Sequence, residues 1–248
     1  MKLNFLIFAS KEYQKRADIL VNSIKKYHDD YHIVVQEPSN SRKDGNYLEG
    51  MAKARLQKAL DLLEEGLENI VILGADCELM GPLLEIENAL TTDLAYDIIV
   101  VPHVLKPTDN RNWMAHLYSV GHANADFMVF RNCDNAKDCL KWMISVTEGY
   151  EPSRSIFYEQ TWLTAVPYLF DEVLILRDPG YNIGYWDANK RNIKNVNGVW
   201  TADNLPIRLV QYSGFVENSL PYMSKHSNEV AVGDVLKLWE EYNKKVIS

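Results

Sequence analysis

Cysteine is scarce in this chain of 248 residues, and positive charge is not in excess. The three cysteines, Cys77, Cys133 and Cys139, form no CxxC motif and no paired framework, which favours a reducing compartment and ordinary buried thiols. The net charge of −8 and the pI of about 5.3 disfavour general electrostatic binding to nucleic acid or anionic lipid, and a local basic pocket is the alternative that they leave open. We therefore expect no nucleic-acid partner and at most peripheral membrane contact.

Long hydrophobic runs are also missing. No stretch approaches the roughly 18 apolar residues that a membrane-spanning helix needs. The opening "MKLNFLIFAS" is apolar only over 5–9 and charged residues follow at once, so it predicts a first β-strand rather than a signal peptide. The apolar fraction of 47% and the charged fraction of 24% are ordinary for a globular protein. We expect a cytoplasmic protein with one large domain.

Short apolar runs alternate with helical periodicity along the first hundred residues. Strands are predicted at "LNFLIFAS", "YHIVVQEP", "NIVILG" and "YDIIVVPH", with helices over 12–27, 47–65 and 83–90 between them. This alternation predicts a largely parallel sheet in a three-layer α/β domain. Ligands of such sheets bind beyond the carboxyl ends of the strands.

The later part of the chain is less regular. Residues 105–125 lose periodicity and are predicted to be loop-rich, before the strand "DFMVF" and a helix over 134–147. The remaining predicted elements are a helix over 157–169, the strand "EVLIL", a loop-rich stretch over 177–198, a late strand in "PIRLVQYSGF" and a C-terminal helix over 235–246. No repeat or linker interrupts this order, so a single domain remains the prediction.

Two carboxylates, Asp76 and Glu78, follow the buried strand in "NIVILGADCELMGPL". Carboxylate oxygens are preferred ligands of hard divalent cations. A cation held there would neutralise a diphosphate leaving group and assist its departure. The alternative is a solvated turn with two surface acids, and the spacing alone does not decide between these interpretations.

The segment "VILGADCELMGPL" resembles the strand and acidic DxD motif of GT-A glycosyltransferases that use nucleotide sugars. The segments "VVPH" with "LKP", "NADF", "YEQTWL", "DPGYNIGYW", "YSGF" and "SKH" follow in the order expected for bacterial enzymes related to the glycogenin-like, family 8-like group. The resemblance covers about 5–226, and the order of the motifs is more specific than any one motif.

This resemblance implies a three-layer GT-A-like (Rossmann-like) nucleotide-diphospho-sugar transferase fold with a mostly parallel central sheet. It also implies a single catalytic domain over 1–248. Residues 1–103 are expected to form the nucleotide-sugar-binding half, 104–230 the acceptor- and sugar-binding half, and 231–248 a C-terminal helix.

The chain departs from the family pattern at three positions. The acidic motif reads either as Gly74-x-Asp76 or as Asp76-x-Glu78, and Asp76 is the expected ligand of Mn²⁺ or Mg²⁺ in both registers. Gln211 stands where related sequences often have histidine; an amide is a poorer ligand, so the metal is held loosely, shared with the diphosphate, or dispensable. Asp126 stands where the resemblance suggests glycine; it either binds sugar hydroxyls, alters the acceptor or is a surface acid.

Further site residues follow from the same resemblance, each with a structural alternative such as a helix start, a solvated lysine or a packed loop. The expected catalytic residues are Glu159, Gln160 and Asp126. The expected nucleotide-sugar-binding residues are Asp76, His103, Asn124, Arg55, Lys225 and His226. The expected metal ligands are Asp76, Glu78 and Gln211, and the expected acceptor-binding residues are Asn182, Tyr185 and Trp186.

The implied reaction is metal-assisted transfer of a sugar from a nucleoside diphosphate sugar, a UDP-sugar above all, to a hydroxyl of a glycan or glycolipid precursor. Such a reaction belongs to bacterial polysaccharide biosynthesis, and the resemblance leans towards retention of the anomeric configuration. A sugar-nucleotide pyrophosphorylase is the weaker rival, since "FASKEYQKR" contains no glycine for a triphosphate-binding loop. The other rival is a degenerate, non-catalytic glycan- or nucleotide-binding protein, for which Gly74 and Gln211 argue.

Overall fold

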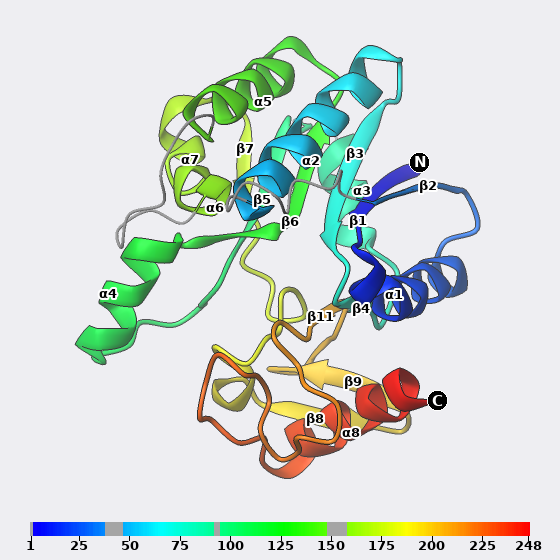
Figure 1. The fold of residues 1–248 in the computed structure, drawn as a ribbon, viewed down its shortest axis with the longest axis vertical. Coiled ribbons are helices and arrows are strands. Elements are labelled where there is room, and N and C mark those ends of the chain that lie inside the picture. Colours follow the sequence, from blue (N-terminus) through cyan, green and yellow to red (C-terminus); the bar gives the residue numbers. More distant parts are fainter. Residues whose placement is uncertain (1, 38–46, 92–94, 148–157) are drawn as a thin grey trace. The chain divides into compact units, whose positions relative to one another are not determined.

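The computed structural model describes residues 2–37, 47–91, 95–147 and 158–248 (Figure 1). Its strands are β1 Leu3–Phe8, β2 Tyr31–Gln36, β3 Asn69–Gly74, β4 Cys77–Leu79, β5 Ile98–Pro102, β6 Ala123–Arg131, β7 Val173–Ile175, β8 Ile193–Val196, β9 Val199–Ala202, β10 Leu205–Pro206 and β11 Leu209–Gln211. Its helices are η1 Lys11–Tyr13, α1 Gln14–Tyr27, α2 Tyr47–Glu64, α3 Leu84–Thr91, α4 Arg111–Val120, α5 Asp134–Thr147, α6 Tyr158–Leu163, α7 Val166–Leu169, η3 Ala188–Lys190 and α8 Gly233–Ile247.

The chain forms two units, each assembled from separate segments. Unit 1 comprises Met1–Lys11, Asp30–Gly74 and Leu84–Leu176. Unit 2 comprises Glu12–Asp29, Ala75–Leu83 and Arg177–Ser248. The candidate residues are therefore considered unit by unit.

Unit 1 contains the central sheet. Within the described residues its six strands run in the order β2-β1-β3-β6-β5-β7. Strand β1 pairs in parallel with β2 and β3, and β5 pairs in parallel with β7. Strand β6 is antiparallel to both of its neighbours, β3 and β5. The predicted α/β fold with a mostly parallel central sheet is confirmed.

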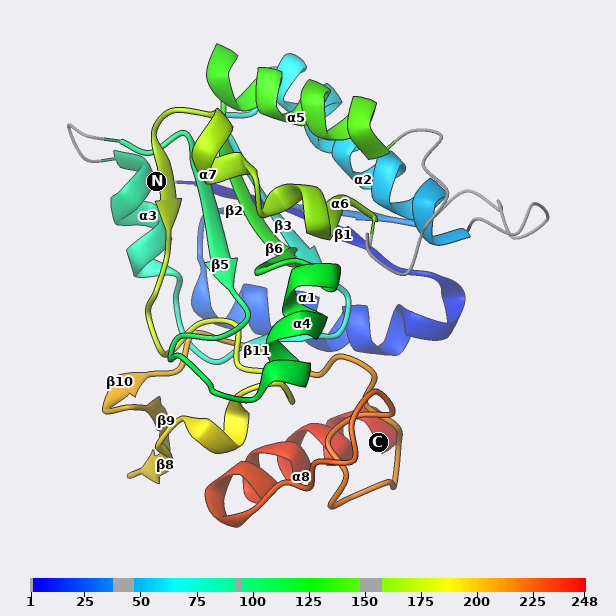
Figure 2. The same ribbon diagram turned by 90° about the vertical axis from the view of Figure 1, so that its left-hand side faces the viewer.

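Both faces of this sheet are covered, as its continuous apolar runs predict. On one face Ile72 and Met128 of the sheet pack in a core with Leu60, Leu140 and Leu163 of α2, α5 and α6. Figure 2 shows these three helices on the same side of the strands. The alternate residues of the strands, which face the other way, are buried as well. Side chains at the ends of the strands are thus held on a rigid base.

The less regular middle of the chain differs from its prediction in two places. Helix α4 lies inside the stretch 105–125 that was expected to be loop-rich. Its N-cap is Asn110, whose side chain accepts a hydrogen bond from Trp113 N, and of the helix residues only Leu117 is buried. The helix expected over 157–169 is divided into α6 and α7, because Pro167 in the first turn of α7 has no N–H to continue the ladder.

Unit 2 contains two smaller sheets and two long helices. Strand β4 pairs with β11, and β9 lies between β8 and β10, all antiparallel. The expected late strand is thus divided into β10 and β11, and the stretch expected to be loop-rich contains η3 and β8. Trp239 and Tyr242 of α8 pack with Tyr212 and Phe215 in the core of this unit. The predicted C-terminal helix is present, slightly longer than expected.

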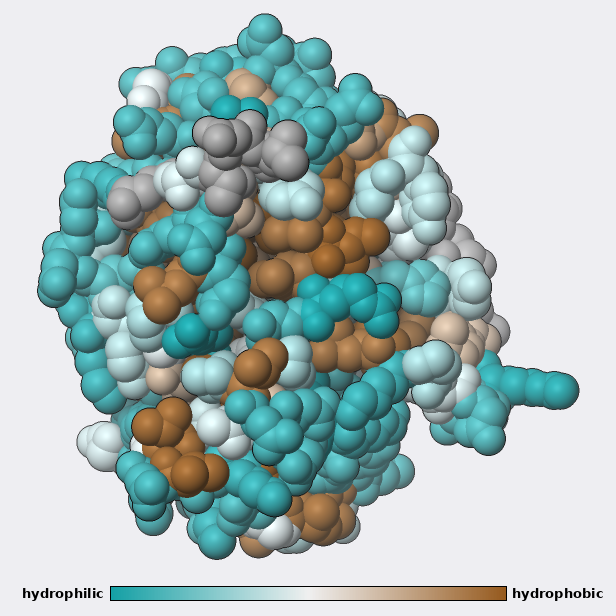
Figure 3. Space-filling model, turned by 180° about the vertical axis from the view of Figure 1, so that it is seen from behind, coloured by the Kyte–Doolittle hydropathy of each residue, from teal (hydrophilic) through white to brown (hydrophobic). Residues whose placement is uncertain are grey.

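On the face shown in Figure 3, hydrophilic side chains cover most of the visible area and hydrophobic ones show in places. Among the residues that the structure describes, no helix combines the length and the apolar character needed to cross a membrane. Cys77 and Cys139 are buried thiols outside any disulfide, and the thiol of Cys133 is half-buried.

Candidate functional site

Three predicted site residues of unit 1 form an ion cluster in which Arg55 and Glu159 are buried and Asp126 is partly exposed. Arg55 of α2 donates from Nη1 to Asp126 Oδ1 of β6 at 2.7 Å and from Nη2 to Glu159 of α6. Burial disfavours the charged guanidinium, but the two carboxylates outweigh it and raise the pKa of Arg55. Residues more than 100 positions apart thus converge where β3 and β6 lie side by side.

Two amides complete this cluster. Asn124 is buried and its Oδ1 accepts a hydrogen bond from Asp126 N at 2.9 Å. Gln160 accepts from Ala125 N through Oε1 at 3.3 Å and donates to Val120 O at 2.7 Å. Gly121 follows α4 with a φ of +105°, and a Cβ there would lie 2.3 Å from Gln160 O. Gln160 therefore joins α6 to β6, and its amide positions the backbone.

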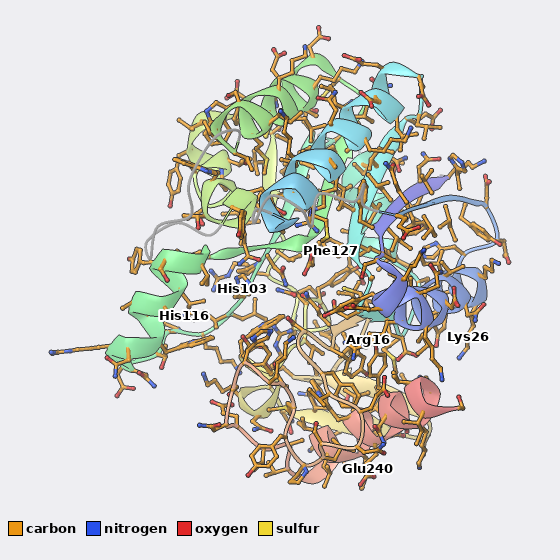
Figure 4. All side chains as sticks on the ribbon, viewed as in Figure 1. Arg16, Lys26, His103, His116, Phe127 and Glu240 are labelled. Carbon is orange, nitrogen blue, oxygen red and sulfur yellow. The ribbon has the colours of Figure 1, made fainter. Side chains whose placement is uncertain are left out.

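His103 lies one residue beyond β5 and is buried (Figure 4). Its backbone N donates to His122 O at 2.9 Å. Burial lowers the pKa of His103 to about 4, although backbone hydrogen bonds and the nearby Asp126 oppose this. The ring is therefore neutral at physiological pH.

The turn that carries Asp76 lies in unit 2. Asp76 is buried, and its backbone O accepts a hydrogen bond from Tyr212 N at 2.9 Å. The β4–β11 ladder places Gln211 opposite Cys77, directly beside this turn. Tyr212 stacks on Tyr242 of α8, with ring centroids 3.6 Å apart. Two of the three predicted metal ligands, Asp76 and Gln211, are thus brought to the same end of this small sheet.

Glu78, the third predicted metal ligand, forms an ion pair with Lys245 of α8. Burial raises the pKa of Glu78, and Lys245 works against this shift. Within the described part of the chain, no three histidine, cysteine, aspartate or glutamate side chains gather as a metal-ligand set. Asp76 and Gln211 can therefore supply only two oxygen ligands to a divalent cation. The other ligands would have to come from a bound substrate.

The motifs "YSGF" and "SKH" meet in one loop cluster of unit 2. Gly214 has a φ of +65°, and a Cβ there would lie 2.3 Å from His226 Cδ2 and 2.6 Å from Ser224 Oγ. Lys225 N donates to Gly214 O at 2.9 Å, and His226 N donates to Ser224 Oγ at 3.1 Å. The side chains of Lys225 and His226 are exposed. Burial, then the charge of Lys225, lowers the pKa of His226.

The predicted acceptor-binding residues occupy one loop of unit 2. Asn182 and Trp186 are buried, Tyr185 is partly exposed, and the rings of Tyr185 and His226 are 6.4 Å apart between centroids. A Cβ at Gly184 would lie 2.3 Å from the ring of Trp186, so this indole packs directly on the loop backbone. Of the three, Tyr185 is the one whose side chain is accessible to solvent.

Arg191, which the sequence analysis did not single out, holds this loop in place. It pairs with buried Asp187 at 2.6 Å, and its Nη1 donates to the carbonyls of Pro179 and Tyr181 at 2.7 and 2.6 Å. Burial, opposed by Arg191, raises the pKa of Asp187 to about 6. The sequence offers no signal for this role, because Arg191 lies among other polar residues in "DANKRNIK".

Comparisons with known proteins agree with the fold. No family model matches the chain. The protein YfnF of Bacillus subtilis (strain 168) is 25% identical over 182 residues, which cover 71% of this chain and 58% of YfnF. The chain thus spans somewhat more than half the length of this curated relative.

Solved glycosyltransferases share the architecture. A glycosyltransferase involved in glycosylation of the major capsid of PBCV-1 superposes with a TM-score of 0.56 at 12% identity, over 87% of this chain and 95% of its own. The galactosyltransferase LgtC, solved with donor and acceptor sugar analogs, gives a TM-score of 0.56 at 11% identity, over 98% and 95%. The predicted GT-A-like fold is therefore confirmed.

Proposed function

We propose that this protein transfers a sugar from a nucleoside diphosphate sugar, a UDP-sugar above all, to a hydroxyl of a glycan or glycolipid precursor. The GT-A-like fold supports glycosyl transfer. The observation that carries the proposal is the convergence in unit 2 of the Asp76 turn with the loop cluster of Gly214, Lys225 and His226. These are the residues expected to bind a diphosphate, and they come from distant parts of the sequence.

Lys225 and His226 are assigned to the diphosphate. Their exposed side chains belong to a loop whose backbone N–H groups donate hydrogen bonds to Gly214 O and Ser224 Oγ. A lysine ammonium donates strong, charge-assisted hydrogen bonds to phosphate oxygens. Donors fixed in this way stabilise the charge that develops on the leaving diphosphate, which lowers the barrier to its departure.

Asp76 and Gln211 are proposed to hold Mn²⁺ or Mg²⁺ together with the diphosphate. Both are buried and supply oxygen ligands, as hard cations require. A bound cation would provide further neutralisation of the leaving group. Glu78 is assigned instead to the ion pair with Lys245, which favours the register Gly74-x-Asp76 over Asp76-x-Glu78.

Unit 1 is proposed to bind the transferred sugar through the cluster of Arg55, Asp126 and Glu159, with Asn124 beside it. Carboxylates accept hydrogen bonds from sugar hydroxyls. Glu159 is a positioning residue in this proposal, because its side chain is 7% exposed and bonded to Arg55. Since no accessible base other than Asp126 is present in this cluster, and Asp126 is itself bonded to Arg55, we propose retention of configuration.

The first test is calorimetric titration of UDP, GDP and CDP in the presence of Mn²⁺, on the wild type and on Lys225→Met. We expect UDP to bind, and Lys225→Met to weaken its binding about tenfold, because one charge-assisted hydrogen bond is lost. Lys194→Met is the matched control, since Lys194 is an exposed lysine of β8 in the same unit. This control should bind UDP as the wild type does.

Turnover separates the remaining alternatives. A transferase should slowly release free sugar from the UDP-sugar that it binds, even without acceptor. Nucleotide binding without any release of sugar would instead support the non-catalytic nucleotide-binding alternative. If none of the three nucleotides bound, the transferase proposal would be wrong.

A further inference from the structure

Gly74 and Asp126 are opposite neighbours at one end of the β3–β6 pair. In this antiparallel ladder Ile72 faces Met128 and Leu73 faces Phe127, so the next step brings Gly74 opposite Asp126. Phe127, labelled in Figure 4, lies in the middle of β6 and next to Asp126. Side chains of directly opposed residues lie on the same face of a sheet. Position 74 and Asp126 therefore compete for the same space.

The structure shows how this competition is resolved. A Cβ at position 74 would lie 2.8 Å from both Cβ and Cγ of Asp126. Asp126 Cβ is attached to the backbone of a central strand and cannot swing aside. Gly74 does not have the positive φ that favours glycine. Glycine is required at position 74 because the side chain of Asp126 lies over it, and not because of the local backbone conformation.

Asp126 is held firmly and is still accessible. Arg55 donates to its carboxylate at 2.7 Å, and its backbone N donates to Asn124. Its side chain is 33% exposed, whereas those of Arg55 and Glu159 are 10% and 7% exposed. Two carboxylates share one guanidinium, so the cluster has an excess negative charge. Of the three charged groups, Asp126 is the one that a hydrogen-bond donor can approach.

We infer that Gly74 and Asp126 are an exchanged pair, in which the carboxylate at the end of β3 is supplied by the neighbouring strand β6 and accepts hydrogen bonds from hydroxyls of the transferred sugar. This inference rests on the proposed function. It also joins two departures from the GT-A pattern that the sequence resembles, namely glycine instead of an acid at position 74 and an acid instead of glycine at position 126. Gly74 then does not argue for a degenerate protein, because Asp126 supplies the carboxylate that is missing at position 74.

The steric half of the inference is tested by thermal unfolding. Gly74→Ala should lower the Tm by roughly 3–10 °C, the usual effect of overpacking in a domain of this size. In an Asp126→Gly background, the same change should be neutral or stabilising, because the clash is gone. In an Asp126→Asn background it should remain destabilising, since asparagine keeps the Cβ and Cγ. If Gly74→Ala changed the Tm equally in the wild type, in Asp126→Gly and in Asp126→Asn, the inference that positions 74 and 126 exclude each other would be wrong.

The binding half is tested by calorimetry with UDP, UDP-glucose, UDP-galactose and UDP-N-acetylglucosamine. Asp126→Asn should weaken the binding of the UDP-sugar that the wild type binds by about tenfold or more. The affinity for UDP itself should stay unchanged. The reciprocal variant Gly74→Asp/Asp126→Gly, which returns the carboxylate to β3, should recover part of this loss. A purely structural role would not change the ratio of UDP-sugar to UDP affinity.

The outcomes separate this inference from the proposed function. If the wild type binds a UDP-sugar and Asp126→Asn binds it equally well, the role of Asp126 is wrong and the proposed function stands. If the wild type binds neither UDP nor any UDP-sugar, the proposed function fails and the sugar-binding role of Asp126 fails with it. The unfolding experiment still decides whether positions 74 and 126 exclude each other.

Discussion

Two glycines are required for different reasons at the scale of single residues. Gly214 has a φ of +65° and also faces His226 and Ser224 at distances that leave no room for a Cβ. Gly74 has no such backbone conformation, and it is required only by the side chain of Asp126. A glycine in a sequence therefore indicates a constraint, but its cause is found in the neighbouring residues.

His103 should make the stability of the protein depend on pH. Its pKa is about 4 in the folded protein and near 6.5 when unfolded, so the unfolded chain binds the proton more readily. The contribution of neutral His103 to the free energy of unfolding is fully present above pH 6.5. It is lost as the pH falls towards 4, and the total loss is about 3 kcal/mol. His103→Gln should remove this slope, as measured by urea unfolding across this pH range.

The matched control for His103 is an exposed histidine. His32 of β2 is exposed. His32→Gln should keep the wild-type dependence of unfolding free energy on pH. If His103→Gln also kept the full slope between pH 6.5 and 4, the assignment of a neutral buried ring to His103 would be wrong.

At the scale of elements, the ion pair between Glu78 and Lys245 joins β4 to the last turns of α8. Glu78 is buried, and Lys245 is partly exposed. Lys245→Met would leave the carboxylate of Glu78 buried without its cation. We expect a loss of about 1–2 kcal/mol in unfolding free energy, less than for a fully buried pair because solvent reaches Lys245.

The pH dependence of this loss identifies its cause. Burial raises the folded pKa of Glu78, so its contribution to stability is present at low pH and is lost as the pH rises through that pKa. Lys245→Met should therefore cost more at pH 8 than at pH 5, by chemical denaturation, and Glu78→Gln should relieve most of the cost. Lys237→Met, which removes an exposed pair with Asp234 on the same helix, should change stability by less than about 0.5 kcal/mol.

A buried ion pair also holds the loop that contains Tyr185 and Trp186. The loop with Tyr185 and Trp186 has little regular structure of its own, yet Arg191 bonds to several of its carbonyls and to Asp187. A guanidinium with fixed donor geometry organises an irregular backbone in a way that a flexible lysine does not. This explains how an irregular loop of unit 2 holds Tyr185 in a defined position.

At the scale of the whole molecule, the net charge of −8 opposes the binding of an anionic nucleotide. In the proposed site, Asp76 and Gln211 are the only described residues that are assigned as ligands of a cation. We therefore predict that Mn²⁺ alone raises the Tm little, whereas Mn²⁺ and UDP together raise it by several degrees, because each completes the binding site of the other.

Asp76→Asn is the variant that tests this mutual dependence. It should abolish the effect of Mn²⁺ on UDP binding in a thermal-shift titration, while the Tm of the ligand-free protein changes little. A large stabilisation of the wild type by Mn²⁺ without nucleotide would contradict the two-ligand site and point to ligands outside the residues assigned here.

The amino-acid sequence by itself determined the α/β class, most elements of the central sheet and the turn that carries Asp76. These depend on local patterns, since a continuous apolar run such as 69–74 can be satisfied only by burial on both faces. Helix α4 escaped prediction because only Leu117 of its residues is buried, which leaves little periodicity.

Only the tertiary structure decided which polar groups meet. The register of β3 on β6 places Asp126 over Gly74, and the packing of α2 and α6 brings Arg55 and Glu159 to the same carboxylate cluster. The packing of α8 directs Lys245 to Glu78, which the sequence had offered as a metal ligand. Register and helix packing are set by the sum of many contacts between residues distant in sequence, and no local pattern contains that sum.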